Sequence, residues 1–366
     1  MSGQTFAVGT RIVTGLGSLE TLPSELADLN QERVVVVADR GLSTTGTLDL
    51  VFDAAPELRA SLTILVDPDP SLEDAEVAAR EALEWRASAV LAVGGGSALC
   101  AAKAVAIRLT NPGPLLDYEG TDMLPRLPAS TIAIPTTAGS GSEVSNALVL
   151  HQQGKTREII IRGTGHEPKV ALLDANLLLG LPDRPLTYAA LDALSHAMEA
   201  LWTRRRSLFT DSLAEFAAET LLADLPSALK ERDPEVLQRL LEASCAANLA
   251  CGNTGLGLIH ALDCAPSVHL AHGYQNGALM LHVGEFNREA MDSRHVGYLD
   301  SICTLFDEIG FAGSFQPGDL GPDAATAIVT ASTGHPFRAN NVRDSTDEEI
   351  AAILTAAGVS PLHPNS

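Results

Sequence analysis

The chain has 366 residues, of which 46% are hydrophobic, 4% are aromatic and 19% are charged. This composition excludes a disordered chain, and the length favours two domains, or one domain with a large appendage, because one domain usually spans roughly 100–200 residues. The formal net charge of -22 disfavours nucleic acids and membrane surfaces as partners, because a field of this sign repels phosphate groups.

We find no targeting signal in the sequence and no pair of cysteines at CxxC spacing. The first residues lack a basic segment followed by an apolar run, and no stretch reaches the roughly 18 apolar residues of a membrane span. The five cysteines are odd in number and form no CxxC pair. We therefore expect a cytoplasmic protein in a reducing compartment.

The first half of the chain alternates strand-like and helix-like stretches. Short apolar runs rich in β-branched residues predict strands at 34–38, 62–66, 89–93 and 131–134. Because nearly every residue in these runs is apolar, we expect a parallel sheet that helices cover on both faces. Ser71, with acidic residues after it, predicts the N-terminus of a helix.

The pattern changes after about Leu181. Ala- and Leu-rich stretches with polar residues at helical spacing fill 187–261, and a further helix is predicted over 345–357 with Ser345 as its cap. The sequence therefore predicts an α/β domain over 1–180 and an all-helical domain over 181–366.

A glycine-rich loop, Gly94-Gly95-Gly96-Ser97, follows the third predicted strand and precedes a helix expected near Ala98. Glycines let main-chain N–H groups approach a phosphate, and the positive end of the helix dipole favours an anion. The loop is not the GxGxxG fingerprint, so a tight strand-to-helix turn explains it equally well.

Two further features lie at the ends of predicted strands. The loop 135–143, PTTAGSGSE, is rich in hydroxyls and small residues where an α/β sheet places its ligand crevice, and a surface loop is the alternative. Asp39 ends the first predicted strand, where a carboxylate can either accept hydrogen bonds from a ribose 2′-hydroxyl or simply terminate the strand.

Asp192 and His196 are four residues apart in an apolar helical stretch, so both project from one face, close enough to share a metal ion. An Asp/His pair at this spacing more often lies on the protein surface. The helical stretch here is apolar, however, and polar groups on such a helix need partners. Further candidate ligands follow in one short stretch: His260, Cys264, His269 and His272. Histidines from this stretch would complete a carboxylate and imidazole site for a divalent transition metal, although a hydrogen-bonded core histidine is more frequent.

These motifs resemble the iron-containing (group III) alcohol dehydrogenases over nearly the whole chain, from Thr14-Gly15-Leu16-Gly17 to the predicted helix 346–357. The most specific parts are PTTAGSGSE, the sequence DALSHAMEA over 192–200, and His272-Gly273. The resemblance implies a dehydroquinate synthase-like architecture, in which 1–180 bind a dinucleotide and 181–366 bind a metal and carry catalysis.

The resemblance also implies two sets of site residues. The cofactor-binding residues would be Asp39, Gly94, Gly95, Gly96, Ser97, Cys100, Thr136, Thr137 and Ser142, with Lys103 at the family's GGGSxxDxxK lysine. The metal ligands would be Asp192, His196, His260 and His272. Asp39 matches a position associated with NAD(H) rather than NADP(H). Fe2+ is the expected metal with Zn2+ as the alternative, because three imidazoles and one carboxylate suit both.

Two positions depart from the family pattern. Cys100 stands where the family usually has Asp near the nicotinamide, and Cys264 stands where it usually has a relay histidine. We hypothesise that His269 replaces that histidine, which makes His269 and Cys264 the expected catalytic residues. As an alternative, His269 rather than His272 is the fourth metal ligand.

The implied activity is metal-assisted hydride transfer between NAD(H) and a small alcohol, aldehyde, ketone or keto acid. A maleylacetate reductase-like reduction of a dicarboxylate would need basic residues facing the metal. Arg204-Arg205-Arg206 is the candidate cluster, although positive charge at a helix C-terminus explains it more simply.

Two other activities are less compatible with the ligand set. A lyase of the dehydroquinate-synthase type would carry Glu in place of Asp192, and a catalytically inactive nucleotide-binding relative would not need the four ligand candidates that this chain keeps. A homodimer is the default expectation for the oligomeric state.

Overall fold

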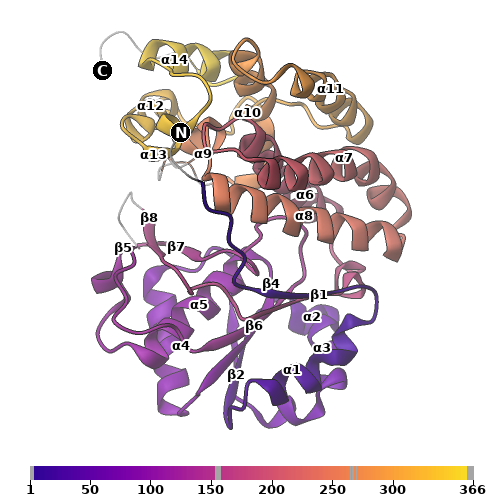
Figure 1. Ribbon diagram of the computed structural model, residues 1–366, viewed down its shortest axis with the longest axis vertical. Helices are drawn as coiled ribbons and strands as arrows, with labels where there is room; N and C mark the ends of the chain where they lie inside the picture. The colour runs from indigo at the N-terminus through magenta and orange to yellow at the C-terminus, as the bar shows by residue number, and fades with distance from the viewer. Residues whose placement is uncertain (1–3, 153–157, 264, 266–267, 269, 361–366) are drawn as a thin grey trace. The chain divides into compact units, whose positions relative to one another are not determined.

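The computed structural model describes residues 4–152, 158–263, 265, 268 and 270–360 (Figure 1). The chain divides into two compact units, one of residues 8–182 and 232–245 and the other of residues 1–7, 183–231 and 246–366. Among the helices of the described residues, none has the length and apolarity that a membrane crossing requires. As domain limits, 1–180 and 181–366 stay a prediction.

The first unit, residues 8–182 and 232–245, is built on a six-stranded sheet with the order β1-β9-β6-β4-β2-β3, and all neighbouring strands run parallel (Figure 1). The strands are β1 (Arg11–Thr14), β2 (Val34–Asp39), β3 (Thr63–Val66), β4 (Ala89–Gly94), β6 (Ser130–Pro135) and β9 (Val170–Leu173). All six residues of β4 are buried, as expected for a central strand covered on both faces. The parallel α/β fold predicted from the apolar runs is therefore confirmed.

Helix α5 (Gly96–Thr110) is buried on nearly all sides. With α4 (Leu72–Glu84) it packs on the main sheet, where Val90 and Ala102 share one core. Another part of α5 packs under a three-stranded sheet of order β5-β8-β7, where Ile107 and Leu150 share a second core. These strands are β5 (Gly120–Thr121), β7 (Ala147–His151) and β8 (Glu158–Arg162). Because two sheets and a helix surround α5, it lacks a polar face.

The remaining helices of this unit connect the strands or follow the last of them in the chain, and α4 begins where the sequence predicts. They are α1 (Leu22–Asp28), α2 (Leu42–Thr45), α3 (Thr47–Ala54) and the first part of α8 (Pro234–Thr254), up to Cys245. The Ser71 hydroxyl accepts the N–H of Asp74, and the Asp74 carboxylate accepts the N–H of Ser71. This reciprocal capping confirms the predicted helix start.

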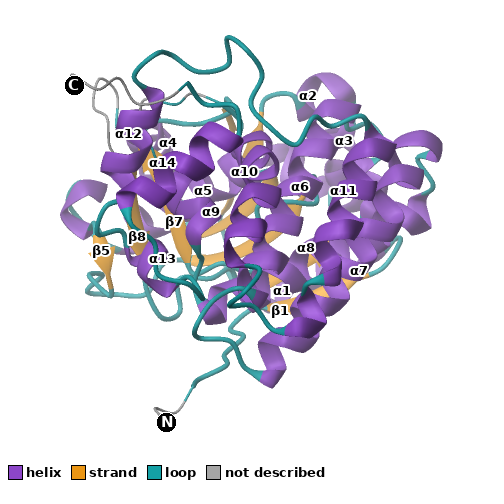
Figure 2. Cartoon of the chain, turned by 90° about the horizontal axis from the view of Figure 1, so that it is seen from above, coloured by secondary structure: helices purple, strands orange, loops and turns teal. Residues whose placement is uncertain are grey.

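The second unit, residues 1–7, 183–231 and 246–366, is helical through its described residues (Figure 2). Its helices are α6 (Asp183–Leu201), α7 (Leu208–Glu231), the end of α8, α9 (Leu258–Asp263), α10 (His272–Asn287), α11 (Gly297–Ile309), α12 (Ala324–Ser332), α13 (Pro336–Asn340) and α14 (Asp347–Ala356). Helix α6 packs against α7 and α10. The change to helical structure after Leu181 is thus confirmed.

The predicted cap of the last helix is wrong by one residue. Thr346, not Ser345, caps α14, because its hydroxyl accepts the N–H of Glu349 while the Glu349 carboxylate accepts the N–H of Thr346. The Ser345 hydroxyl instead accepts a hydrogen bond of 2.9 Å from Arg338 Nε. The Ser345 hydroxyl, which was predicted to cap the helix, therefore binds Arg338 instead.

Candidate metal centre and glycine-rich loop

Three of the four predicted metal ligands come together in the helical unit. Asp192 and His196 lie one turn apart on α6, and His260 lies on α9. Asp192 Oδ1 is 4.0 Å from His196 Nε2 and 3.8 Å from His260 Nε2, and one ligand atom from each residue lies within 4.8 Å of the other two. Metal bonds to nitrogen and oxygen are about 2.0–2.2 Å long, so donor atoms up to about 4.2 Å apart can share one ion. The geometry therefore suits a divalent metal ion.

Burial and charge set the ionisation of these three groups. Burial lowers the pKa of His196 to about 4, against the opposing attraction of Asp192, so this imidazole is neutral at pH 7. Burial disfavours the Asp192 carboxylate, but the charges of His196 and His260 outweigh this and lower its pKa. Burial also acts to lower the pKa of His260, but the Glu199 and Asp192 carboxylates outweigh it and raise that pKa to about 10. An ionised carboxylate beside a neutral imidazole is a donor set typical of iron or zinc sites.

Two buried carboxylates that the sequence analysis missed lie behind the histidine rings. Glu199, near the end of α6, accepts a hydrogen bond of 2.7 Å from Nδ1 of His260. Asp263, the last residue of α9, has Oδ2 2.5 Å from Nδ1 of His272. Glu199 lies inside the motif DALSHAMEA, and its position one turn after His196 was a usable signal.

His272 begins α10, and its side chain is 54% exposed. A Cβ on the next residue, Gly273, would lie 1.8 Å from the carbonyl oxygen of Tyr188 on α6, so the two helices meet main chain to main chain. The charge of His272 acts on both Asp192 and His196. Among the described residues, the ligand atoms of Asp192, His196 and His260 that lie within 4.8 Å of one another do not include an atom of His272, so its role as fourth ligand is a proposal.

The two residues predicted to be catalytic, Cys264 and His269, lie outside the described residues. Their roles in proton transfer, and the alternative of His269 as a metal ligand, stay predictions.

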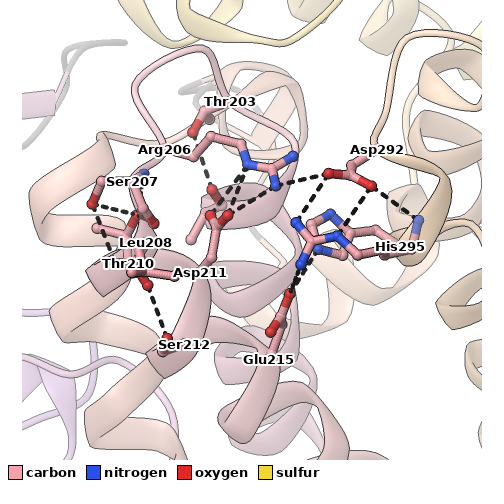
Figure 3. A network of polar contacts seen from close by, with 12 residues as sticks. Thr203, Arg206, Ser207, Leu208, Thr210, Asp211, Ser212, Glu215, Asp292 and His295 are labelled. Carbon is pink, nitrogen blue, oxygen red and sulfur yellow. Dashed lines mark hydrogen bonds and ion pairs between the residues drawn. The ribbon is translucent and has the colours of Figure 1, made fainter.

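The arginine cluster lies between the C-terminal end of α6 and the start of α7, and Figure 3 shows its Arg206 beside Asp211 and Asp292. Arg206 Nη2 is 2.8 Å from Asp211 Oδ2 and 3.3 Å from Asp292 Oδ2. Arg204 Nη2 is 2.7 Å from Asp344 Oδ1. Both guanidinium groups therefore already bind carboxylates of their own unit.

The glycine-rich loop of the α/β unit joins β4 to α5. Gly94 has a φ of +145°, and a Cβ on it would lie 2.7 Å from Cβ of Ala98 and 3.1 Å from Cβ of Asp39. Helix α5 begins at Gly96, two residues earlier than predicted, and its cap residue Gly95 makes no side-chain hydrogen bond. Gly95 has no side chain that could accept hydrogen bonds from the first N–H groups of α5. These N–H groups and the positive end of the helix dipole therefore suit a phosphate.

The loop 135–143 lies beside the glycine-rich loop because β6 pairs with β4. The N–H of Thr136 donates to the carbonyl of Gly94 at 3.0 Å. A Cβ on Gly95 would lie 3.3 Å from the side chain of Thr137. The carboxyl ends of β2, β4 and β6 therefore bring Asp39, the glycine-rich loop and both threonines to one edge of the sheet, where α/β folds bind nucleotides.

Other predicted cofactor-binding residues have direct partners near this edge. Cys100 Sγ lies 3.6 Å from Ser142 Oγ, and the Ser97 hydroxyl accepts a hydrogen bond of 3.0 Å from the N–H of Asp69. A Cβ on Gly96 would lie 2.8 Å from the Ser140 side chain, a neighbour that the sequence analysis missed.

Lys103 ties α5 to the chain that leads into β7. Its buried ammonium donates to the carbonyls of Ser145 and Ala147 at 2.8 Å and 2.9 Å. Burial lowers the pKa of Lys103 to about 8. These contacts give Lys103 a structural role next to the loop 135–143.

Comparison with known proteins gives matches to both units. The family model described as iron-containing alcohol dehydrogenase matches residues 9–175, and the C-terminal model of the Fe-containing alcohol dehydrogenase family matches residues 186–358. The probable alcohol dehydrogenase EutG of Salmonella typhimurium is 31% identical, over 97% of this chain and 95% of the relative. The 1-propanol dehydrogenase PduQ of Citrobacter freundii is 31% identical, over 82% of this chain and 79% of the relative.

Solved structures agree with these sequence matches. An iron-containing alcohol dehydrogenase from Thermococcus thioreducens has a TM-score of 0.87 at 28% identity, with 96% of this chain and 99% of that chain covered. The sulfoacetaldehyde reductase from Bifidobacterium kashiwanohense, solved in complex with NAD+, has the same fold, with a TM-score of 0.88 at 24% identity over 98% of this chain and 99% of that chain. The chain belongs to the iron-containing alcohol dehydrogenase family of oxidoreductases.

Proposed function

We propose that the protein transfers a hydride between NAD(H) and a small alcohol, aldehyde or ketone, with Fe2+, or Zn2+ as the alternative, held by Asp192, His196, His260 and His272. The observation that carries this proposal is the buried group of one carboxylate and two imidazoles, with facing atoms 3.8 Å and 4.0 Å apart, in a chain of this family. A divalent ion in this site would supply Lewis-acid chemistry toward the substrate oxygen.

The residues around the centre support this use. Asn276, one turn after His272 on α10, donates from Nδ2 to Asp192 Oδ1 at 2.8 Å and lies 3.2 Å from His260 Nε2. It therefore orients the carboxylate while contacting the imidazole. The low pKa of His196, about 4 because of burial, leaves a neutral ring with a free lone pair at neutral pH.

The sheet edge of the other unit supports NAD(H) as the dinucleotide. The loop Gly94–Ser97 and the start of α5 would bind the pyrophosphate, and Asp39 would accept hydrogen bonds from the ribose 2′-hydroxyl and repel a 2′-phosphate. Thr136, Thr137, Ser142 and Cys100 would line the nicotinamide half. The NAD+ bound by the Bifidobacterium reductase is consistent with this assignment.

A small primary alcohol and its aldehyde are the proposed substrate pair. The names of two relatives, a probable alcohol dehydrogenase and a 1-propanol dehydrogenase, favour this choice. The dicarboxylate alternative is less favoured, because two residues of its candidate cluster, Arg204 and Arg206, already pair with carboxylates of their own unit. A cytoplasmic homodimer completes the proposal, and light scattering of the purified protein tests its oligomeric state.

The test is metal reconstitution followed by a substrate panel. Protein stripped with a chelator is loaded with Fe2+ under anaerobic conditions or with Zn2+, and NADH or NADPH is followed with short alcohols, diols, aldehydes and keto acids. We expect turnover of 1-propanol and propanal that requires the metal and prefers NAD(H). Metal-loaded protein that binds NAD(H) but neither reduces nor oxidises any member of the panel would contradict the proposal.

A further inference from the structure

Glu199 has a position that the proposed chemistry has not yet used. Its side chain is 1% exposed, and its carboxylate accepts hydrogen bonds from the N–H groups of Gly257, at 2.9 Å, and of Ile259. The same carboxylate accepts from Nδ1 of His260 at 2.7 Å. Glu199 therefore fixes both the start of α9 and the ring that α9 carries.

This contact decides which nitrogen of His260 can bind a metal ion. A carboxylate only accepts hydrogen bonds, so the proton of the neutral ring must sit on Nδ1. The lone pair of the neutral ring is then on Nε2, the atom 3.8 Å from Asp192 Oδ1. The partner behind the ring thus selects the tautomer that the metal site requires.

His272 has the same arrangement on another helix. Asp263 is 4% exposed, and its Oδ2 lies 2.5 Å from Nδ1 of His272. By the same reasoning, Asp263 leaves the lone pair of His272 on Nε2. Two of the three histidines proposed as ligands, His260 and His272, are therefore each backed by a buried carboxylate.

His196 offers an internal contrast. Its Nδ1 is buried and has no hydrogen-bond partner among the described residues. The ring stacks on that of His260 instead, with centroids 4.7 Å apart and planes 16° apart. Packing rather than a hydrogen bond orients this third histidine.

We propose that Glu199 and Asp263 are positioning residues that set the metal affinity of the centre, because each holds one histidine in the tautomer that carries its lone pair on Nε2. This inference rests on the proposed function, since it assumes that His260 and His272 bind the metal. It adds two residues outside the ligand set whose loss weakens metal binding while all four ligands remain.

The test replaces each carboxylate with its isosteric amide. In Glu199→Gln the amide oxygen can still accept the N–H groups of Ile259 and His260, but the amide NH2 then replaces Oε2 and faces both Nδ1 of His260 and the N–H of Gly257. Nδ1 must accept a hydrogen bond, the ring proton moves to Nε2, and the lone pair that binds metal is lost. Asp263→Asn makes the same change at His272 without touching the start of α9, and Glu289→Gln, at an exposed position of the same unit, is the control.

Zn2+ affinity is measured by competition with a chromophoric chelator, and the Co2+ visible spectrum reports the geometry of the site. We expect about 10–100-fold weaker Zn2+ binding in Glu199→Gln and in Asp263→Asn, an altered Co2+ spectrum, and wild-type Zn2+ binding in Glu289→Gln. Thermal unfolding of the metal-free Asp263→Asn protein should match that of metal-free wild type, which separates ligand positioning from loss of structure.

The outcomes separate this inference from the proposed function. If wild type binds Zn2+ and turns over while both amide variants bind Zn2+ with wild-type affinity, the positioning role is wrong and the proposed function stands. If wild type itself binds neither Zn2+ nor Fe2+, the proposed function fails and this inference fails with it.

Discussion

The two candidate sites of the molecule are built from different parts of the chain. At the sheet edge the groups that suit a ligand are main-chain N–H groups of Gly94–Ser97, and the side chains there are small. In the candidate metal centre the possible ligand atoms belong to side chains on helices, and buried carboxylates lie against Nδ1 of His260 and of His272. A site made of main-chain groups is sensitive to added volume, whereas a site made of side chains is sensitive to changed chemistry.

The units also differ in how they carry buried acidic groups. Asp192 and Glu199 each lie against an imidazole, and the neighbouring histidine charges lower the pKa of Asp192 although burial opposes this. In the α/β unit, burial raises the pKa of Glu143 to about 7, and the Lys103 charge only partly offsets this effect. The candidate metal centre therefore keeps the Asp192 carboxylate ionised, while the α/β unit bears a destabilising carboxylate, that of Glu143, at neutral pH.

The largest effect is expected from His196→Ala, which removes one ligand of the centre. We expect kcat/KM to fall about 10³-fold or more, corresponding to about 4 kcal/mol of transition-state stabilisation, with an unchanged Kd for NADH. Steady-state kinetics and NADH fluorescence titration measure both quantities. His282→Ala is the control, because His282 contacts the carbonyl of Gly313 in the same unit. A loss of NADH affinity as large as the loss in kcat/KM would show that the two candidate sites do not act independently.

The second largest effect is expected on the free energy of unfolding and comes from the buried Glu143. Below pH 4.5 Glu143 is protonated in both the folded and the unfolded chain, but as the pH rises toward about 7 the unfolded chain loses its proton first. The folded chain thus holds the Glu143 proton more tightly than the unfolded chain does. The stability that this proton contributes to the fold is therefore present at low pH and is lost as the pH rises through about 7. We expect Glu143→Gln to raise the free energy of unfolding at pH 8 by up to about 3 kcal/mol relative to its effect at pH 4.5, because each pKa unit corresponds to about 1.4 kcal/mol.

Denaturant titrations across this pH range check the prediction. Glu57→Gln, at an exposed position of the same unit, should show no such difference from wild type. A Glu143→Gln protein whose unfolding free energy keeps the wild-type pH profile would mean that Glu143 is ionised normally.

A smaller effect is expected at the glycine-rich loop. In Gly96→Ala the new Cβ would lie 2.8 Å from the Ser140 side chain, which must shift, and the proposed pyrophosphate site at the start of α5 gains volume. We expect the Kd for NADH to rise about tenfold, or 1.4 kcal/mol, while the Zn2+ content is unchanged. Gly180→Ala is the matched control, because a Cβ there meets nothing within 4 Å. Loss of bound Zn2+ in Gly96→Ala would contradict the contrast between the sites.

The smallest effect is expected from Asp39→Asn. The amide oxygen can keep the 2.7 Å hydrogen bond that Asp39 Oδ1 accepts from the N–H of Gly41, so the strand end is preserved and only the charge is removed. We expect the ratio of kcat/KM for NAD+ over NADP+ to fall by less than about tenfold, because one repulsive charge is lost and no phosphate ligand is added. An unchanged ratio would mean that Asp39 does not determine the preference for NAD+ over NADP+.

The sequence predicted β2, β3, β4 and β6 from their runs of apolar residues, but it missed β9, whose four apolar and buried residues form too short a run to stand out. Strands β2, β4 and β6 are central and buried, so their β-branched runs are distinctive. Strand β1 was missed because Arg11–Thr14 is a short, partly exposed edge strand, and β7 was missed because its residues alternate between buried and exposed. The loop of Gly94–Ser97 was found because glycine carries a local signal.

In the metal centre, the ligand pair on α6 was predictable because i and i+4 positions share a helix face. Asp263 was missed because only the fold pairs it with His272, and Glu199 was missed although it lies one turn after His196, because its partner His260 is 61 residues away. The role of Asn276 depends in the same way on the packing of α10 against α6.

The contact between Gly273 and the carbonyl of Tyr188 has a consequence for engineering. Because two main chains touch there, no side-chain replacement can bring α10 closer to α6, and any larger residue at 273 must push the helices apart. The spacing between the α6 ligands and His272 is thus a constant of the scaffold rather than an adjustable quantity. Libraries that aim to broaden the substrate range should leave this helix crossing untouched and place their diversity elsewhere in the chain.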